Sequence, residues 1–569
     1  MPIQMMNTQV RVIKKPDDMV CIAEINTSPL LDNDYERKTH FIFVMDVSAS
    51  MDEPAVPPEA GNNGAVFISP ENTRLNYITR VLGACLNLVR TTNDAYNDIF
   101  VSVVTFSRKV QTIVKHANGD VMTEDAIKKI IRDVKCQRRE STNFERAMQH
   151  VMSEVTMITP NTQASPVNEI VVFMTDGCIT HGTSEESELT NLMVNSQQQI
   201  PDWRFIGVGT DFDYLLLNSL KLNIDKRDQL PNRPVITVDF MDNIENAHII
   251  YADVISPYLS RSVYNVMLSS LDEYAPVYFG NPTTGILDSK QFHMGIIPAG
   301  TTRYVALRLT DDTQCAFSYS DSKFHPCHGP ATTNMVVTST SFVTTEDSSD
   351  DTLLFDVMKL RQECIESVGA CYKMIENRCE SDNLHRHAFV NFNPAVLSTP
   401  RRRTSYNFEH SLNEDMSSSD EEIKTPEVRG RQPNDDLSSH KECLLTLQEK
   451  VKDFLKDERH ASISDTLSDI LKQCIDDISF AIGAIDRVQS TGHGVLARMV
   501  IGSRLNSQQY QRSYTITTPS LLDNNDYYEN DNQNVSSNVS LMNNNNYSPF
   551  TTHVTRSISQ VISSQSQHY

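Results

Sequence analysis

Residues 41–51 are Phe-Ile-Phe-Val-Met-Asp-Val-Ser-Ala-Ser-Met, an apolar run that ends in a carboxylate and two hydroxyl side chains. A short, uninterrupted apolar run followed by polar residues predicts a buried β-strand over Phe41–Val47. Open α/β sheets bind ligands at the carboxyl ends of their parallel strands, where this polar loop would lie. The stretch therefore predicts both the class of fold and the end of the sheet that carries a site.

Similar apolar runs recur up to residue 262 and alternate with amphipathic segments, which predicts an α/β fold with a doubly wound, mostly parallel sheet. The predicted strands are Phe41–Val47, Phe100–Phe106, Val110–Val114, Ile170–Thr175, Arg204–Val208 and Val235–Asp239. The predicted helices are Arg74–Arg90, Thr123–Val134, Asn143–Val155, Glu185–Gln199, Tyr214–Leu222 and Ile244–Leu259. The short separation of the second and third strands predicts a hairpin and one antiparallel edge strand.

The rest of the chain shows other patterns. Short alternating strands over 263–345, and two more at Val10–Ile13 and Val20–Ile25, predict a β-sandwich into which the α/β domain is inserted. Helical spacing returns at Thr352–Arg378, Lys441–Lys456 and Ser464–Arg487. The predicted organisation is 1–39 sandwich strands, 40–262 α/β domain, 263–345 sandwich, 346–397 helical segment, 398–437 disordered acidic linker, 438–518 helical region and 519–569 disordered Asn/Ser-rich tail.

Oxygen donors gather on three loops that follow predicted strands or open a helix. Asp46, Ser48 and Ser50 follow the first strand, Thr142 precedes a helix, and Asp176 ends the apolar strand Ile170–Thr175. Carboxylate and hydroxyl oxygens suit a hard divalent cation, Mg²⁺ or Mn²⁺. The first motif alone favours a capped helix start over a metal site, and it is the agreement of three loops that favours a metal site.

The segments VMDVSASM (44–51), STNFERAM (141–148) and IVVFMTDG (170–177) resemble the von Willebrand factor type A family in order and separation, over about residues 40–262. The resemblance implies a metal-ion-dependent adhesion site. Ser48 and Ser50 would be direct ligands, Thr142 a ligand in the binding-competent state, and Asp46 and Asp176 direct or water-bridged ligands. It also implies that a Glu or Asp of a protein partner completes the coordination sphere.

Two features depart from that family's pattern. A loop of about twenty residues, Asp52–Glu71, separates the first motif from the next helix, where relatives have a short connection. Charged residues, Arg138-Arg139-Glu140, precede the threonine motif where small residues are usual. Both lie beside the predicted site and bear on its affinity for metal.

The chain outside the α/β unit resembles a eukaryotic group that sets this domain among β-strands and follows it with a region called Vwaint. The segments that carry this resemblance are Gly207–Asp213, Gly295–Leu309 and Ala497–Ser513. Some relatives add a RING finger or a self-splicing Hint domain, but the sequence contains neither the Cys/His ladder nor the Cys-started block that these need.

Charge and cysteine usage exclude several function classes. The formal charge of −23, from 73 acidic against 50 basic residues, disfavours binding to nucleic acids or anionic membranes. The 11 cysteines form no CxxC pair, which is typical of reduced core residues. No apolar run is long enough for a signal peptide or a membrane span, so we expect a cytoplasmic protein.

We therefore expect an interaction protein that is not an enzyme. A Mg²⁺-dependent phosphatase would need a second carboxylate two residues after Asp46, where Ser48 stands, and no phosphate-binding GxxxxGK[ST] loop is present. Zinc binding by Cys315, His325, Cys327 and His328 fits no usual spacing. A scaffold that works without metal, and an adaptor in the ubiquitin pathway that lacks its own RING finger, remain open alternatives.

Overall fold

The computed structural model describes most of residues 8–505 and a C-terminal segment. The described residues are 8–15, 18, 20–27, 37–53, 73–92, 97–137, 140–156, 167–177, 179–194, 200–208, 212–225, 227, 234–241, 247–259, 262–270, 291–298, 300–308, 315–320, 332–337, 342–344, 349–392, 433–457, 463–491, 497–498, 501–502, 504–505, 553–566 and 568. Most of the Asp52–Glu71 loop, Arg138 and Arg139, and the linker up to residue 432 lie outside them.

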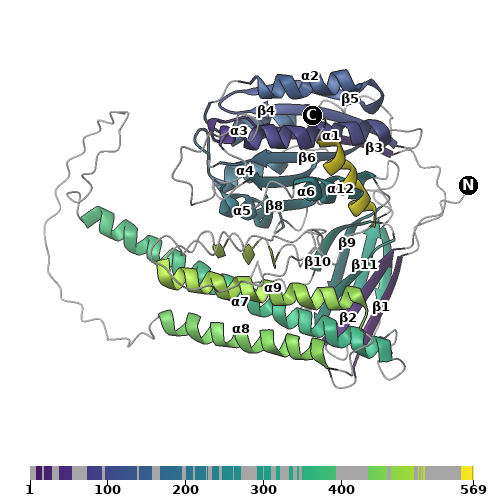
Figure 1. Ribbon diagram of the computed structural model, residues 1–569, viewed down its shortest axis with the longest axis vertical. Helices are drawn as coiled ribbons and strands as arrows, with labels where there is room; N and C mark the ends of the chain where they lie inside the picture. Colours follow the sequence, from purple (N-terminus) through teal and green to yellow (C-terminus); the bar gives the residue numbers. More distant parts are fainter. Residues whose placement is uncertain are drawn as a thin grey trace, which may run out of the picture.

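A six-stranded sheet forms the centre of the α/β domain, in the order β5-β4-β3-β6-β7-β8 (Figure 1). Its strands are β3 (Arg37–Asp46), β4 (Asn97–Phe106), β5 (Val110–Asn118), β6 (Val167–Thr175), β7 (Asp202–Val208) and β8 (Ile236–Met241). All neighbours are parallel except β4 and β5, which form the predicted hairpin at the edge. The predicted fold class is confirmed.

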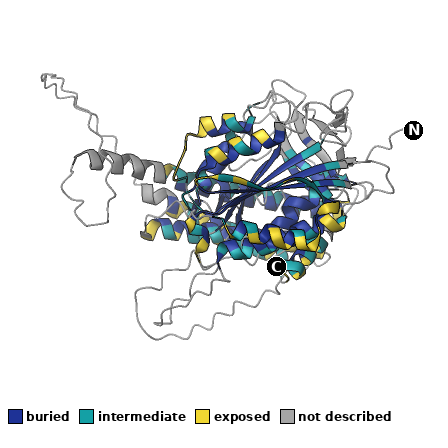
Figure 2. Ribbon diagram, turned by 90° about the horizontal axis from the view of Figure 1, so that it is seen from above, coloured by how far each residue is buried: buried dark blue, intermediate teal, exposed yellow. Residues whose placement is uncertain are grey.

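Helices flank this sheet and leave most of its strands buried, as the dark blue strands of Figure 2 show, while the edge strand β5 (Val110–Asn118) is only partly covered. The helices are α1 (Arg74–Thr92), α2 (Glu124–Lys135), α3 (Phe144–Thr156), α4 (Glu186–Val194), α5 (Tyr214–Asp225) and α6 (Ala247–Leu259). The start of α2 is explained by its local sequence, because the Thr123 hydroxyl caps the helix by accepting a hydrogen bond from Ala126 N at 3.2 Å. Phe106, Phe144 and Phe173 pack ring against ring between β4, α3 and β6.

The strand order reverses its direction at β3. After β3 the chain moves outward through β4 and β5 on one side, and then returns to add β6, β7 and β8 on the other side. The loops that follow β3 and β6 therefore lead in opposite directions from neighbouring strands. Ligands of doubly wound sheets bind at such a reversal point, so the topology places the polar loops after Asp46 and Thr175 where a site is expected.

Eight further strands form two four-stranded sheets, ordered β11-β2-β1-β14 and β10-β9-β12-β13. They are β1 (Thr8–Lys14), β2 (Val20–Thr27), β9 (Ser262–Ser270), β10 (Gln291–Pro298), β11 (Thr302–Arg308), β12 (Cys315–Ser320), β13 (Thr332–Val337) and β14 (Phe342–Thr344). β2 pairs with β11, and β1 pairs with β14. The strands before the α/β domain thus share a sheet with strands after it, as the sequence predicts.

Three long helices, α7 (Ser349–Phe392), α8 (Pro433–Lys456) and α9 (Asp465–Thr491), pack together and against the first of these sheets through Ile13 and Ile22. α8 begins inside the segment predicted to be a disordered linker, so that prediction is wrong for residues 433–437. Proline is favoured at a helix start, and the buried Leu437 anchors this first part of α8. None of the described helices is both long and apolar enough to cross a bilayer.

The predicted disorder of the tail is also wrong in part, because residues His553–Ser566 form a helix, α12. This helix lies against α1 and α6 of the α/β domain (Figure 1). Ile562 is fully buried, and the hydroxyls of Thr555 and Ser256 are 3.0 Å apart. The Asn/Ser-rich composition predicted disorder, whereas the small apolar stripe of α12 is stabilised by the faces that it covers.

Replacing Ile562 by Ala should lower the free energy of unfolding by about 2 to 5 kcal/mol, the usual cost of truncating a buried isoleucine side chain to alanine. Urea unfolding of the full chain, followed by circular dichroism, measures the change. The exposed Gln560 on the same helix provides the matched control, Gln560→Ala, which should leave the midpoint unchanged. Equal midpoints for both variants would contradict the docking of α12.

Candidate metal centre

Asp46 is the last residue of β3, and both oxygens of its carboxylate are held by hydrogen bonds. The backbone N–H of Ser48 donates to Oδ1 at 2.8 Å, and the hydroxyl of Thr175, at the end of β6, donates to Oδ2 at 2.8 Å. The side chain is completely buried. The neighbouring strands β3 and β6 therefore fix the carboxylate at the reversal point of the sheet.

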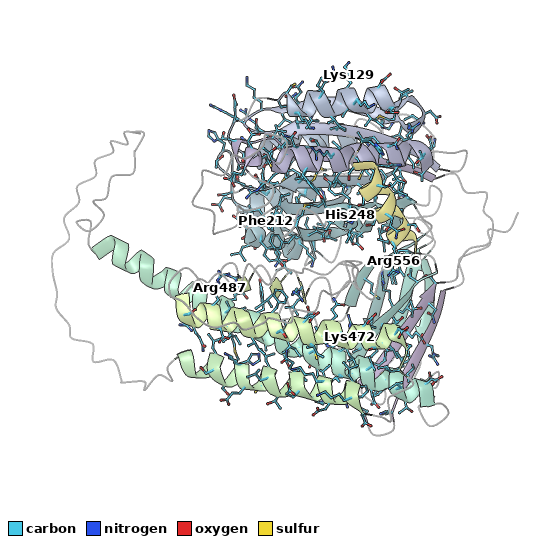
Figure 3. The ribbon with its side chains drawn as sticks, viewed as in Figure 1. Lys129, Phe212, His248, Lys472, Arg487 and Arg556 are labelled. Carbon is cyan, nitrogen blue, oxygen red and sulfur yellow. The ribbon has the colours of Figure 1, made fainter. Side chains whose placement is uncertain are left out.

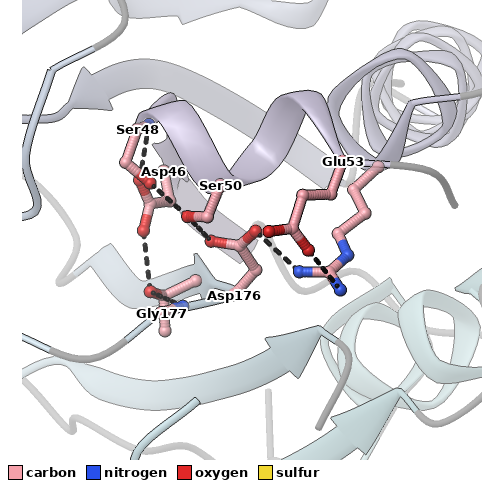
Figure 4. A network of polar contacts seen from close by, with 8 residues as sticks. Asp46, Ser48, Ser50, Glu53, Asp176 and Gly177 are labelled. Carbon is pink, nitrogen blue, oxygen red and sulfur yellow. Dashed lines mark hydrogen bonds and ion pairs between the residues drawn. The ribbon is translucent and has the colours of Figure 1, made fainter. Parts of the chain in front are cut away.

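A chain of hydroxyl groups joins the loop after β3 to Asp176, as Figure 4 shows. The hydroxyl oxygens of Ser48 and Ser50 are 3.0 Å apart, and the Ser50 hydroxyl donates to Asp176 Oδ1 at 2.7 Å. Since the single proton of Ser50 is used on Asp176, the Ser48 hydroxyl is the donor to Ser50. Four of the five predicted site residues thus form one polar network.

Thr142, the fifth predicted residue, lies next to this network rather than within it. Its backbone oxygen accepts hydrogen bonds from Thr180 N at 3.1 Å and His181 N at 3.0 Å, which fixes the loop before α3. A Cβ atom added at Gly177 would lie 3.7 Å from Thr142 Oγ1 and 3.6 Å from Ser50 Oγ. The two hydroxyls therefore border the same small space, which the absence of a side chain at Gly177 leaves open.

The two carboxylates have perturbed proton affinities. Burial raises the pKa of Asp46 to about 7, with a further contribution from the charge of Asp176. Burial also raises the pKa of Asp176, although hydrogen bonds from Ser50 and Arg74 oppose this shift. Two buried acidic groups side by side are costly when ionised, and a bound cation is one way to compensate them.

The structure adds two residues that the sequence motifs did not include. Arg74 Nη1 lies 3.1 Å from Asp176 Oδ2, and Arg74 Nη2 lies 3.1 Å from Glu53 Oε2. The sequence contained one indication of the role of Arg74. A cation at the first residue of a helix is disfavoured by the helix dipole, which indicates that a nearby carboxylate compensates it.

The residues present fit a hard divalent cation. The donors are hydroxyl and carboxylate oxygens throughout, and the open space beside Gly177 is bordered by two of the hydroxyls. Within the described ranges, no group of three or more His, Cys, Asp or Glu side chains has an arrangement that could hold a metal, so this site depends on its serine and threonine oxygens. The alternative zinc residues His325, Cys327 and His328 lie outside the described residues.

Residues 41–178 match the family model of the von Willebrand factor type A domain. The matched segment includes the three loops that carry Asp46, Thr142 and Asp176. The chain therefore contains a von Willebrand factor type A domain.

Several solved structures are similar to the chain. A von Willebrand factor type A protein from Catenulispora acidiphila is 11% identical, over 66% of this chain and 82% of that one, with a TM-score of 0.41. The ArnB paralog VWA2 from Sulfolobus acidocaldarius is 11% identical, over 89% of this chain and 98% of that one, with a TM-score of 0.40. Proximal thread matrix protein 1 from the mussel byssus is 18% identical, over 41% of this chain and 50% of that one, with a TM-score of 0.29. No curated protein matches the sequence.

Proposed function

We propose that the protein is a metal-dependent protein-interaction module in which Asp46, Ser48, Ser50, Thr142 and Asp176 hold Mg²⁺ or Mn²⁺. The observation that carries the proposal is the continuous network from Asp46 to Asp176, with the Thr142 hydroxyl on its open side. Von Willebrand factor type A domains commonly act as interaction modules of this kind.

The partner is a protein that presents an exposed Glu or Asp. Three neutral hydroxyls and two carboxylates leave a bound divalent cation with an incomplete coordination sphere. A carboxylate from a partner fills such a position and forms a charge-assisted contact. The cation supplies an electrostatic bridge, while β3, β6 and the start of α3 hold the protein's own oxygens in place.

We propose no catalytic role for this site. Both carboxylate oxygens of Asp46 accept hydrogen bonds, from Ser48 N and from the Thr175 hydroxyl, which does not favour a role as a nucleophile. Ser48 also stands where a phosphatase would need a second carboxylate. We place the protein in the cytoplasm, where free thiols such as those of Cys85, Cys371 and Cys474 are stable. The grouping with proteins that carry a Vwaint region stays a prediction.

Titration calorimetry of the full chain with Mg²⁺ and Mn²⁺ tests the proposal. Saturable binding is expected for the wild type, and a cation at a hundred times its dissociation constant should stabilise the fold by about 2.7 kcal/mol. The double variant Ser48→Ala/Ser50→Ala should lose both the binding heat and the stabilisation, because two direct oxygen ligands are removed.

Two exposed serines of the same domain provide the matched control, Ser153→Ala/Ser187→Ala, which should bind as the wild type does. Absence of binding in the wild type would refute the metal mechanism and favour a scaffold that works by shape alone. Binding that survives in the Ser48/Ser50 variant would place the cation elsewhere.

A further inference from the structure

An arginine contacts the candidate metal centre from the side opposite to its hydroxyls. The Arg74 guanidinium lies 3.1 Å from Asp176 Oδ2, while Asp176 Oδ1 accepts the hydrogen bond from Ser50 at 2.7 Å. The two oxygens of one buried carboxylate therefore face different surroundings. Oδ1 faces the Ser50 hydroxyl, and Oδ2 faces a permanent positive charge (Figure 4).

The position of Arg74 is electrostatically unfavourable for the helix that carries it. Arg74 is the first residue of α1, whose first turn contains no acidic residue to offset a cation. The N-terminal end of a helix carries a partial positive charge and disfavours Lys or Arg. Contacts with Asp176 and Glu53 compensate this cost, so the guanidinium is held by the carboxylates and not by the helix.

Burial makes the ion pair with Asp176 the more important of the two contacts. The side chain of Arg74 is 13% exposed and that of Asp176 is 0% exposed, whereas that of Glu53 is 53% exposed. Water screens the pair with Glu53, and the pair with Asp176 is screened far less. Arg74 thus neutralises mainly the carboxylate that a cation at the site would share.

We propose that Arg74 is an internal counter-cation of the metal centre, which competes through Asp176 with a bound Mg²⁺ or Mn²⁺ and lowers the affinity of the site for it. The inference rests on the proposed function of the site. A guanidinium next to a carboxylate weakens proton binding to that carboxylate about tenfold or more, and the same Coulombic repulsion acts on any cation at Oδ1.

The charge balance also bears on the partner. A divalent cation held by Asp46 and Asp176 is formally neutralised by them, and Arg74 adds one further positive charge beside the cluster. The half-exposed Glu53 offsets part of it, since solvent screens its charge. Arg74 therefore decreases the affinity for the cation and increases the attraction of the occupied site for the carboxylate of a partner.

Calorimetric titration of the full chain with Mn²⁺ alone tests the inference. Arg74→Gln should decrease the dissociation constant for Mn²⁺ about tenfold. Glu53→Gln should increase the dissociation constant for Mn²⁺ about threefold, because the positive charge of Arg74 beside Asp176 is then no longer offset by Glu53. The control is Arg90→Gln, in the last turn of the same helix and exposed, which should leave the dissociation constant unchanged.

A second readout separates this role from a merely structural one. In the presence of a chelator, Arg74→Gln should lower the thermal transition, because the buried Asp176 loses its ion pair, and saturating Mn²⁺ should restore it. A variant that stays destabilised in saturating Mn²⁺, with an unchanged or weaker affinity, would overturn the inference and leave Arg74 as a support for the loop.

The outcomes also distinguish this inference from the proposed function. Equal Mn²⁺ affinity in the wild type and in Arg74→Gln overturns the inference while the metal site stands. No binding in either protein overturns both. Binding in Arg74→Gln but not in the wild type supports the inference, with Arg74 in place of the cation, and overturns the proposed metal dependence of the wild type.

Discussion

Asp46→Asn should stabilise the protein by about 2 to 4 kcal/mol at pH 8 in the absence of divalent cations, and should abolish metal binding. Burial raises the pKa of Asp46 from 3.8 to about 7, so the ionised carboxylate opposes folding at alkaline pH. An asparagine of the same shape can still accept from Ser48 N, and the Thr175 hydroxyl can turn to accept from the new amide. The same change removes a charged ligand from the site.

The pH dependence has a definite sign. Because the folded pKa lies above the unfolded value, the contribution of Asp46 to stability is present below about pH 4 and is lost as the pH rises to about 7. The advantage of Asp46→Asn should therefore be small at pH 4, grow up to pH 7 and stay constant above it. Urea unfolding at several pH values in a chelator measures this difference.

A control and a converse measurement complete the test of Asp46→Asn. Asp125→Asn removes an exposed carboxylate from the first turn of α2 and should change stability by less than about 1 kcal/mol at every pH. Saturating Mn²⁺ should stabilise the wild type and leave Asp46→Asn unaffected. If Asp46→Asn were less stable than the wild type at pH 8, burial of the ionised Asp46 carboxylate would not lower the stability of the folded protein.

Gly207→Ala should destabilise the protein by about 3 kcal/mol or more. Gly207 lies in β7, and a Cβ atom at this position would come within 2.3 to 2.4 Å of three ring atoms of Phe212. The ring is 4% exposed and stacks on Phe240 at a centroid distance of 5.5 Å, so it cannot move aside without disturbing the core. Phe212 is labelled in Figure 3.

A second substitution tests whether the ring is the cause of the cost. Phe212→Leu alone should destabilise the protein modestly, and the double variant Gly207→Ala/Phe212→Leu should be more stable than the sum of the two single effects predicts. Thermal or urea unfolding of the four proteins gives the interaction energy. Strict additivity would contradict the close approach of Gly207 and Phe212.

Much of the α/β domain could be predicted from the sequence, because its central strands are buried and apolar and helices such as α1 and α2 carry clear apolar stripes. Ile170–Thr175 reads as a strand without tertiary information, and the structure places β6 at Val167–Thr175. Helix α12 could not be predicted in this way. Its few apolar residues are insufficient for an isolated helix, and α1 and α6, which are far from it in sequence, provide the surfaces that stabilise it.

The candidate site was predictable only where the motif residues are close in sequence or at strand ends. Asp46, Ser48 and Ser50 share one loop, and the parallel pairing of β3 and β6 brings Asp176 beside them. Arg74 is different, because its contact with Asp176 depends on where α1 begins after a loop whose path the sequence does not predict. The ion pair, and with it the charge balance of the site, required the three-dimensional structure.

The shared sheet also determines the order in which the chain can fold during synthesis. Val20 in β2 pairs with Arg308 in β11. The hairpin of β1 and β2 can therefore complete its sheet only after nearly 290 further residues have left the ribosome. All strands of the α/β domain emerge within that interval, between Arg37 and Met241. The von Willebrand factor type A domain can thus fold first, and its completion brings the two halves of the outer sheet together. Until then β2 has an unpaired edge, and an unpaired strand edge can pair with another chain, so the nascent chain is open to aggregation at this strand.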